Sequence, residues 1–454
     1  MRILLIQALN AREYVQTVFP GLGLAYLASY LKARIPEVEL RIIQGEVGNA
    51  VSEFKPQIVG ISSVTQNWPI AREIARGAKE SGALVVVGGA HITALPGELD
   101  ENMDVGVLGE GEITLVTLVR SFDPRTRTIR NLEAVPGIVY LRTGQLATTQ
   151  PALHVEPLDD LPFPDRRLLD LPRHGVVHLF SSRGCPYRCT FCFSSRYWGK
   201  PRYFSPGYVL RELAQVIAEH APTRIFFFDD LFLVPKDRFR MIARDIIAAG
   251  YHRKVEFDVN CRANLVDDET ADLLKEMNVA TANLGFESAS EATLKYLKGG
   301  SVTVQQNWDA VRTLRKRGIK VSGTFIIGSP RETREEILET LEFVRKSGIH
   351  FLETYILTPL PGTPIWRHGL DRGLVFAPMD WRLLDQESDH HRDDRVILSE
   401  VLTRDELYDL YDRFRRLKTR KHMLTWALSA LRQPQRIPRF LLRHASMAWH
   451  RNRR

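Results

Sequence analysis

Residues 181–194 read Ser-Ser-Arg-Gly-Cys-Pro-Tyr-Arg-Cys-Thr-Phe-Cys-Phe-Ser. Their cysteines, Cys185, Cys189 and Cys192, have the spacing C-x3-C-x2-C, and the aromatic residue Phe191 directly precedes the last of them. Three thiolates on one loop can hold three corners of a cubane iron–sulfur cluster and leave the fourth iron open. The alternatives are a structural zinc site or a chance grouping. A closed zinc site needs a fourth Cys or His at short range, and the neighbouring sequence supplies none.

Short apolar runs alternate with helical patterns in the sequence before this segment. Strands are predicted at 2–6, 38–43, 57–62, 83–89 and 104–109, and helices at 22–33 and 70–80. This alternation predicts an α/β unit with a doubly wound, Rossmann-like parallel sheet covered by helices.

Ligands of such sheets bind beyond the carboxyl ends of the strands. The candidate binding residues at those ends are Ser62, Ser63, Gly88, Gly89, His91 and Gly109. Glycine lets a ligand approach the backbone closely, although each of these turns could also be a plain strand–helix connection. No G-x-G-x-x-G motif opens the first predicted helix, so the sequence does not predict a dinucleotide site.

The cysteine segment resembles the signature of the radical S-adenosylmethionine (SAM) superfamily, C-x3-C-x-aromatic-C. Downstream segments resemble strand ends and a closing turn of the same superfamily, at residues 225–230, 285–288, 325–332 and 358–364. The resemblance implies a partial (β/α)6 barrel of the TIM type with its chemistry at the C-terminal face. It also implies that SAM chelates the open iron of a [4Fe–4S] cluster and is cleaved there to a 5′-deoxyadenosyl radical.

The same resemblance implies contacts between SAM and individual residues. Asp229 and Asp230 stand where the superfamily often has Gly-Gly-Glu, beside the methionine part of SAM. Gly328 lies in the segment expected against adenine. Arg262 and Glu287 are expected to bind the ribose and methionine parts, the alternative being an ion pair between the two.

The N-terminal half resembles the cobalamin-binding domains of cobalamin-dependent radical SAM enzymes, on residues 19–28, 88–96 and 109–112. Many cobalamin domains carry D-x-H-x-x-G after the first strand, whereas residues 7–12 here read Gln-Ala-Leu-Asn-Ala-Arg. We therefore expect no protein imidazole on cobalt. His91 lies in a different loop, and we expect it to contact the backbone or the tail of the cofactor. The alternative is a sheet that has lost its cofactor.

The positive charge of the chain is concentrated at its C-terminus. The 454 residues carry a net charge of +8, and residues 413–454 hold thirteen Lys and Arg and no Asp or Glu, which leaves −5 for the remainder. Specific nucleic-acid binding through the body is therefore not expected. The tail, with Trp426, Phe440 and Trp449, could lie on an anionic membrane, pack as helices on the body, or contact RNA.

Four cysteines are too few for a disulfide framework in so long a chain, and the N-terminus lacks the pattern of a signal peptide. A cytoplasmic protein without membrane-spanning segments is expected, with its tail as the part that could bind the inner face of the membrane. The predicted organisation is a cobalamin-binding domain at 1–140, a linker at 141–172, a radical SAM barrel at 173–390 and a helical basic extension at 391–454.

By resemblance, the expected function is cobalamin-dependent radical methylation of an unactivated carbon, with a [4Fe–4S] cluster, SAM and cobalamin as cofactors. The alternatives are cyclisation, oxidation or rearrangement within the same group, or a non-catalytic iron–sulfur or RNA-binding protein. The expected partners are a small-molecule substrate, such as a lipid, tetrapyrrole or secondary metabolite, and a reductant such as flavodoxin or ferredoxin.

Overall fold

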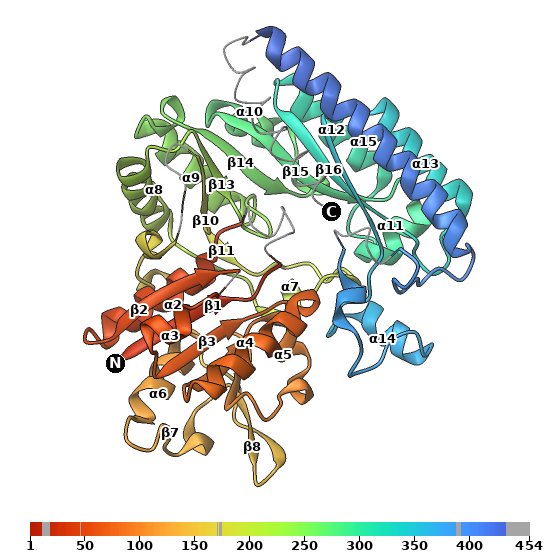
Figure 1. Ribbon diagram of the computed structural model, residues 1–454. Helices are drawn as coiled ribbons and strands as arrows, with labels where there is room; N and C mark the ends of the chain where they lie inside the picture. Colours follow the sequence, from red (N-terminus) through yellow and green to blue (C-terminus); the bar gives the residue numbers. More distant parts are fainter. Residues whose placement is uncertain (11–18, 46, 170, 172–174, 387–391, 433–454) are drawn as a thin grey trace.

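The structure is a computed structural model that describes the chain except for residues 11–18, 46, 170, 172–174, 387–391 and 433–454. Side chains of residues 424–432 are likewise outside the description. Two parallel sheets organise the chain, and in Figure 1 the N-terminal unit lies below the larger second unit.

The N-terminal unit contains the predicted doubly wound sheet. Its parallel strands are β1 (Arg2–Gln7), β2 (Glu39–Gln44), β3 (Ile58–Ser62), β4 (Leu84–Gly88) and β5 (Val105–Val107), in the spatial order β2-β1-β3-β4-β5. Its helices are α2 (Leu22–Arg34), α3 (Ala50–Phe54), α4 (Trp68–Glu80), α5 (Ala90–Ala94) and α6 (Glu112–Ser121). Alternate residues of β1 are buried on opposite faces: Leu5 packs in one core with α2 and α6, and Leu4 packs in the other with α4.

The N-terminal sheet continues beyond the predicted domain boundary at 140. Strand β8 (Ile138–Arg142) pairs antiparallel with β5, and β9 (Gln145–Thr148) pairs with β8. The expected boundary therefore cuts through a hairpin. The hairpin adds the hydrogen-bonded strands β8 and β9 beside β5, which was the last strand of the predicted sheet and therefore its open edge.

The second unit has six parallel strands arranged in sequence order, as a partial barrel requires. They are β10 (Val176–Leu179), β13 (Arg224–Phe227), β14 (Glu256–Cys261), β15 (Val279–Glu287), β16 (Lys320–Ile327) and β17 (Phe351–Ile356). The helices that follow them are α8 (Pro206–His220), α9 (Lys236–Ala248), α10 (Asp268–Glu276), α11 (Glu291–Lys298), α12 (Val304–Lys316) and α13 (Arg334–Lys346). The fold class expected from the sequence is confirmed.

Several barrel helices begin where a side chain caps their first turn. Ser205, Ser290 and Thr333 each accept a hydrogen bond from the backbone N–H three residues later. At Thr333 the Glu336 side chain also accepts from the Thr333 backbone, which completes a capping box. These caps fix the point at which each loop of the active face turns into a helix.

The segment after the barrel returns to the N-terminal unit. We call residues 364–385 the strap; it contains α14 (Pro364–Asp371) and a short 3₁₀ helix (Trp381–Leu384). Trp366, Trp381 and Leu384 are buried in the apolar core that β1, β3 and α4 form. The prediction had assigned the strap to the barrel. These three side chains complete the N-terminal core, whereas Ile365 of the strap packs with the barrel residues Ile326 and Leu357.

Helix α15 (Arg404–Arg432) covers the outer edge of β17 and runs beside α13 (Figure 1). The Lys421 ammonium donates to the Ile349 carbonyl at 3.0 Å, and the Leu352 backbone N–H donates to His422 Nε2 at 3.2 Å. Lys418 also pairs with Glu353. Up to His422, then, the basic extension packs on the body and satisfies a sheet edge that would otherwise be open.

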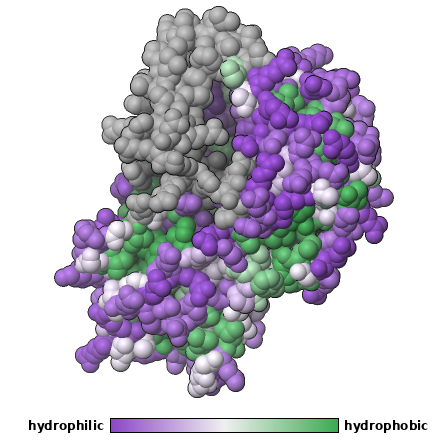
Figure 2. Space-filling view, turned by 45° about the vertical axis from the view of Figure 1, so that its right-hand side comes forward, coloured by the Kyte–Doolittle hydropathy of each residue, from purple (hydrophilic) through white to green (hydrophobic). Residues whose placement is uncertain are grey.

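None of the described helices combines the length and apolar character needed to cross a membrane. The face shown in Figure 2 is mainly hydrophilic, with apolar residues in scattered patches. Trp426, Phe440 and Trp449 lie outside the residues whose side chains the structure describes, so membrane contact stays a prediction.

Candidate active site

The three cysteines lie on a loop between the short strand β11 (Ser182–Arg183) and helix α7 (Ser194–Tyr197); we call residues 184–193 the cysteine loop. Gly184 opens it at φ +90°, and a Cβ atom there would lie 3.0 Å from Trp198 Cβ. Burial raises the pKa of the Cys185 thiol to about 11 and that of Cys192 to about 12. Both thiols therefore carry protons near neutral pH, and a bound metal would have to displace them.

Arg262 lies against the cysteine loop. Its Nη1 donates to Cys189 Sγ at 3.6 Å, and its guanidinium carbon lies 3.9 Å from the centroid of the Tyr187 ring. Its Nη2 donates to Ser301 Oγ at 2.5 Å. Arg262 therefore places a buried cation beside the cysteine loop.

Asp229 and Asp230 have different positions. Asp229 is fully buried and accepts from the backbone N–H groups of Ser181 at 2.6 Å and Ser182 at 3.1 Å. Asp229 thus supports Ser181 and Ser182, which lead into the cysteine loop. The prediction had assigned the oxygens of this carboxylate to SAM. Asp230 is exposed and accepts from the Ser194 hydroxyl, just beyond Cys192.

Glu287 does not pair with Arg262, which was the alternative considered for these residues. Its partner is Lys298, at 3.2 Å, and both side chains are buried. Glu287 has φ +65° and lies at a register shift between β15 and β16. Its carboxylate folds back over Gly285, where a Cβ atom would lie 2.3 Å from Glu287 Oε1. This contact explains why glycine precedes the glutamate by two positions.

Gly328 ends β16 with φ +83°. Glu332 holds this turn, because its Oε2 accepts from the N–H groups of Gly328 at 2.7 Å and Ser329 at 3.1 Å. Burial raises the pKa of Glu332 to about 8. Phe191, within the cysteine loop, packs against the apolar cluster that contains Leu297 and Ile365.

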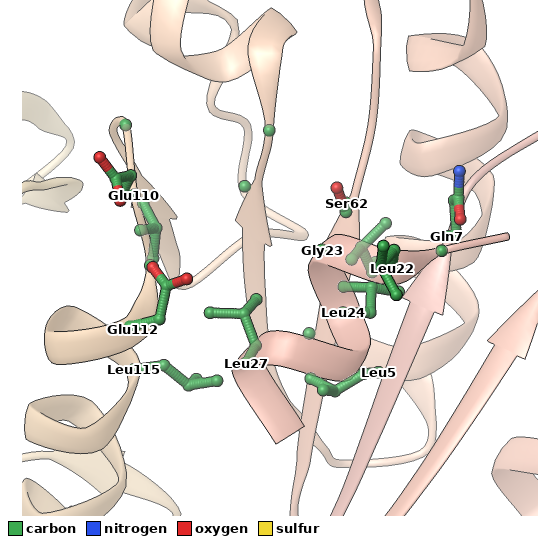
Figure 3. A pocket seen from close by; sticks show the side chains of 18 of the residues that line it. Leu5, Gln7, Leu22, Gly23, Leu24, Leu27, Ser62, Glu110, Glu112 and Leu115 are labelled. Atoms are coloured by element: carbon green, nitrogen blue, oxygen red, sulfur yellow. The ribbon is translucent and has the colours of Figure 1, made fainter. Parts of the chain in front are cut away.

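A cavity of about 250 Å³ opens at the carboxyl edge of the N-terminal sheet (Figure 3). Of the predicted binding residues, Ser62, Gly88, Gly89 and Gly109 line it; Ser63 and His91 are not among its described lining residues. The deep part is apolar, with Leu5, Leu27 and Leu115 around it. The barrel contributes His178, Phe180, Arg183, Tyr197, Trp198 and Phe228, so the cavity lies between the two units.

The cavity has the features of a ligand site. Gln7 Oε1 is buried without a hydrogen-bond partner among the described residues. A Cβ atom at Gly21 would lie 2.5 Å from that oxygen, and one at Gly89 would lie 2.6 Å from the Ser63 carbonyl oxygen. Glu110 and Glu112 also line the cavity; the sequence analysis had them within a matching motif but did not single them out.

His91 is enclosed away from this cavity. Its ring centroid lies 4.4 Å from that of Trp68 and 4.8 Å from that of Trp381 in the strap, and its Nδ1 is 3.3 Å from Thr65 Oγ1. Burial lowers the pKa of His91 to about 3, so the imidazole is neutral. We expected His91 to contact the backbone or the tail of the cofactor. The strap, which is distant in sequence, covers the His91 ring, so its position does not support a contact with the cofactor tail.

Comparison with known proteins agrees with this arrangement of the two units. The radical SAM superfamily model matches residues 179–344, and the B12 binding domain model matches residues 11–119. An uncharacterized methyltransferase of Pyrococcus horikoshii is 34% identical over 393 residues, covering 82% of this chain and 83% of the relative. The chain belongs to the cobalamin-dependent radical SAM family.

Other members of this family are more distant. The anaerobic magnesium-protoporphyrin IX monomethyl ester cyclase of Cereibacter sphaeroides is 26% identical over 425 residues, covering 89% of this chain and 68% of the relative. The radical SAM methyltransferase TsrM of Kitasatospora setae, solved with cobalamin and a [4Fe–4S] cluster, shares the fold with a TM-score of 0.68 at 20% identity, over 83% of this chain and 76% of that one.

The residues of this radical SAM enzyme fit the family's cofactors, which are a [4Fe–4S] cluster, SAM and cobalamin. The cysteine loop offers three thiols, and the cavity offers a glycine-lined, largely apolar site with an unpartnered amide oxygen. Within the described residues, no group of three or more Cys, His, Asp or Glu side chains is set for a single metal ion. A cubane cluster takes each thiolate on a different iron, so its ligands need not converge on one point.

Proposed function

We propose that this protein is a cobalamin-dependent radical methyltransferase that replaces a hydrogen on an unactivated carbon of a small molecule with a methyl group. The observation that carries the proposal is the direct contact between the two candidate cofactor sites. Tyr197, just after the cysteine loop, donates its hydroxyl to the carbonyl of Gly109, a residue that lines the cavity, at 3.0 Å. When bound, the cluster with SAM supplies the hydrogen-abstracting radical, and cobalamin supplies the methyl group.

We propose the following roles for residues of this chain. The thiols of Cys185, Cys189 and Cys192 ligate the cluster, and Arg262 positions Cys189 by donating to its Sγ at 3.6 Å. Asp230, Glu287 and Gly328 lie on the active face and contact SAM. Ser62, Gly88, Gly89 and Gly109 border the cobalamin, whereas Ser63, His91, Phe191 and Asp229 support the surrounding structure.

The test is an anaerobic reaction of the reconstituted protein with a reductant and SAM carrying an isotopically labelled methyl group, with candidate small molecules as substrates. A methyltransferase of this kind consumes two SAM molecules per product and releases one S-adenosylhomocysteine and one 5′-deoxyadenosine. Formation of a labelled product together with both nucleosides is the expected result. Formation of 5′-deoxyadenosine without S-adenosylhomocysteine would contradict methyl transfer.

A second candidate function is ring formation on a tetrapyrrole, which the 26% identity over 425 residues with the Cereibacter cyclase favours. The two functions differ in how they use SAM. A cyclase has no need for the methyl group, so it forms 5′-deoxyadenosine without S-adenosylhomocysteine. The nucleoside ratio therefore separates the two before the substrate is known.

We further propose two partners. A small acidic electron carrier, such as flavodoxin or ferredoxin, supplies the electron. An anionic membrane surface binds residues 424–454, which hold seven Arg and no Asp or Glu. The part of the extension before residue 424 packs on β17. We therefore assign packing on the body to this first part and membrane binding to residues 424–454.

A further inference from the structure

The four residues Gly109–Glu112, which we call the coupling loop, join β5 to α6 and contact both candidate cofactor sites. All four line the cavity in the N-terminal unit. They also contact Arg183, directly before the cysteine loop, and Tyr197, at the end of α7 after it, and both of these residues line the cavity as well. The coupling loop and the chain that flanks the cysteine loop therefore meet at the wall of the cavity.

The first contact is made by Arg183, two residues before Cys185. Its Nη1 donates to Glu110 Oε2 at 2.5 Å, and its Nη2 donates to Glu112 Oε1 at 2.6 Å. Arg183 is 7% exposed, and Glu110 and Glu112 are each 5% exposed. The planar guanidinium fixes the directions of both bonds, and their burial makes them sensitive to any displacement of either partner.

The second contact follows the last cysteine. Tyr197 donates its hydroxyl to the Gly109 carbonyl at 3.0 Å, and burial raises the pKa of Tyr197 to about 12, so the phenol keeps the donated proton. Glu110 is additionally held by Arg202 and by His154, whose Nδ1 lies 2.7 Å from Glu110 Oε1. The coupling loop is thus fixed against the barrel at both ends of the cysteine loop.

We propose that Arg183 is a positioning residue that couples occupancy of the cobalamin cavity to the geometry of the cluster site. Cobalamin in the cavity would set the position of Glu110 and Glu112, and Arg183 would transmit that position to Cys185 through one intervening residue, Gly184. Binding at the two sites is then cooperative, and by linkage each cofactor strengthens binding of the other by the same factor. This inference rests on the proposed assignment of the cavity to cobalamin.

The test measures the dissociation constant of hydroxocobalamin by ultrafiltration, on full-length protein with and without its reconstituted cluster. The ratio of the two constants is the coupling, and it does not depend on turnover. In the wild type we expect cluster assembly to tighten cobalamin binding by roughly 5- to 150-fold, the usual range for coupled sites. Iron content is measured in each loaded sample, so that only cluster-bearing chains are compared.

The main variant combines Arg183→Gln with Glu112→Gln, so that no buried carboxylate is left without its cation. We expect its ratio to fall well below the wild-type value, while the remaining bonds from Tyr197 to Gly109 and from Arg202 to Glu110 keep part of the coupling. Tyr197→Phe removes only one hydrogen bond and should give an intermediate ratio. The matched control is Arg166→Gln with Glu212→Gln, which removes another buried ion pair of 2.7 Å, between the segment that precedes the barrel and α8; neither residue lines the cavity.

Each outcome decides the matter. A wild-type ratio of one, or an unchanged ratio in the Arg183 variant, overturns the coupling while leaving cobalamin binding established. If the ratio falls in the control as well as in the main variant, the cause is a general loss of stability, and this result also overturns the proposed coupling. Failure of the wild type to bind hydroxocobalamin in either state would refute the cavity assignment itself, and the proposed function with it.

Discussion

Replacing Gly23 with Trp tests whether the N-terminal cavity holds cobalamin. Gly23 lies near the start of α2 and lines the cavity, and a Cβ atom there would have no neighbour within 4 Å (Figure 3). The Cβ atom of the new side chain therefore meets no other atom in the free protein. Because glycine is a poor helix former, the variant should be as stable as the wild type or more stable by about 0.5 kcal/mol.

The indole would occupy part of a cavity of about 250 Å³, so a cofactor would have to displace it or bind against it. Forcing an extra side chain into a filled site typically costs about 1–3 kcal/mol. Since 1.4 kcal/mol corresponds to a factor of ten, cobalamin binding should weaken by roughly 5- to 150-fold. Gly23→Ala, which adds one methyl group, should change binding little.

The assay is an anaerobic titration with hydroxocobalamin, and urea unfolding confirms that each variant is folded. Gly77→Trp is the matched control, because Gly77 is also an exposed helical glycine of this unit with no atom within 4 Å of a Cβ, on α4. Equal affinities of the Gly23→Trp and Gly77→Trp proteins would show that cobalamin binds elsewhere.

Four more results are expected. Changing all three cysteines of the cysteine loop to Ala should reduce iron from about four per chain to almost none and stop formation of 5′-deoxyadenosine, whereas the buried Cys261 can be changed to Ala without either loss; residual 5′-deoxyadenosine would disprove the ligand set. Paramagnetic resonance of bound cob(II)alamin should show no nitrogen splitting from a protein imidazole, and His91→Phe should leave the spectrum unchanged, because His91 lies between two tryptophans; a splitting that disappears in this variant would refute the placement. Burial raises the pKa of the Glu332 carboxyl from its usual 4.5 to about 8, so between these pH values the folded chain keeps a proton that the unfolded chain has lost. The free energy of unfolding of the wild type should therefore fall from pH 4.5 to 8, by at most about 1.4 kcal/mol per pH unit. Glu332→Gln should remove this slope, and an unchanged slope would assign it to another group. Deleting residues 424–454 should leave unfolding of the body unchanged and abolish salt-sensitive sedimentation with anionic vesicles, unlike the intact chain; equal sedimentation of both proteins would exclude a membrane role for the tail.

Local sequence determines the parts of this protein that depend on spacing or on backbone conformation. The C-x3-C-x2-C pattern places three thiols on one loop whatever surrounds it. The alternation of apolar runs and helical patterns predicted the N-terminal parallel sheet, because burial between helix layers selects such runs, and the barrel sheet was implied by the resemblance of its motifs. Gly89 and Gly328 could also be identified from their motifs, since each adopts a positive φ, which glycine adopts readily.

Only the tertiary structure decided which side chains meet across these elements. The strap packs on the N-terminal core and encloses His91, so a histidine that resembles a cofactor contact in the sequence is a buried neutral ring. Glu287 pairs with Lys298 rather than Arg262, because a register shift in β15 turns its carboxylate back over Gly285. The bonds from Arg183 to Glu110 and Glu112 join residues more than seventy positions apart. No local pattern encodes such contacts, because they depend on the packing of two separately folded sheets and on the exclusion of water between them.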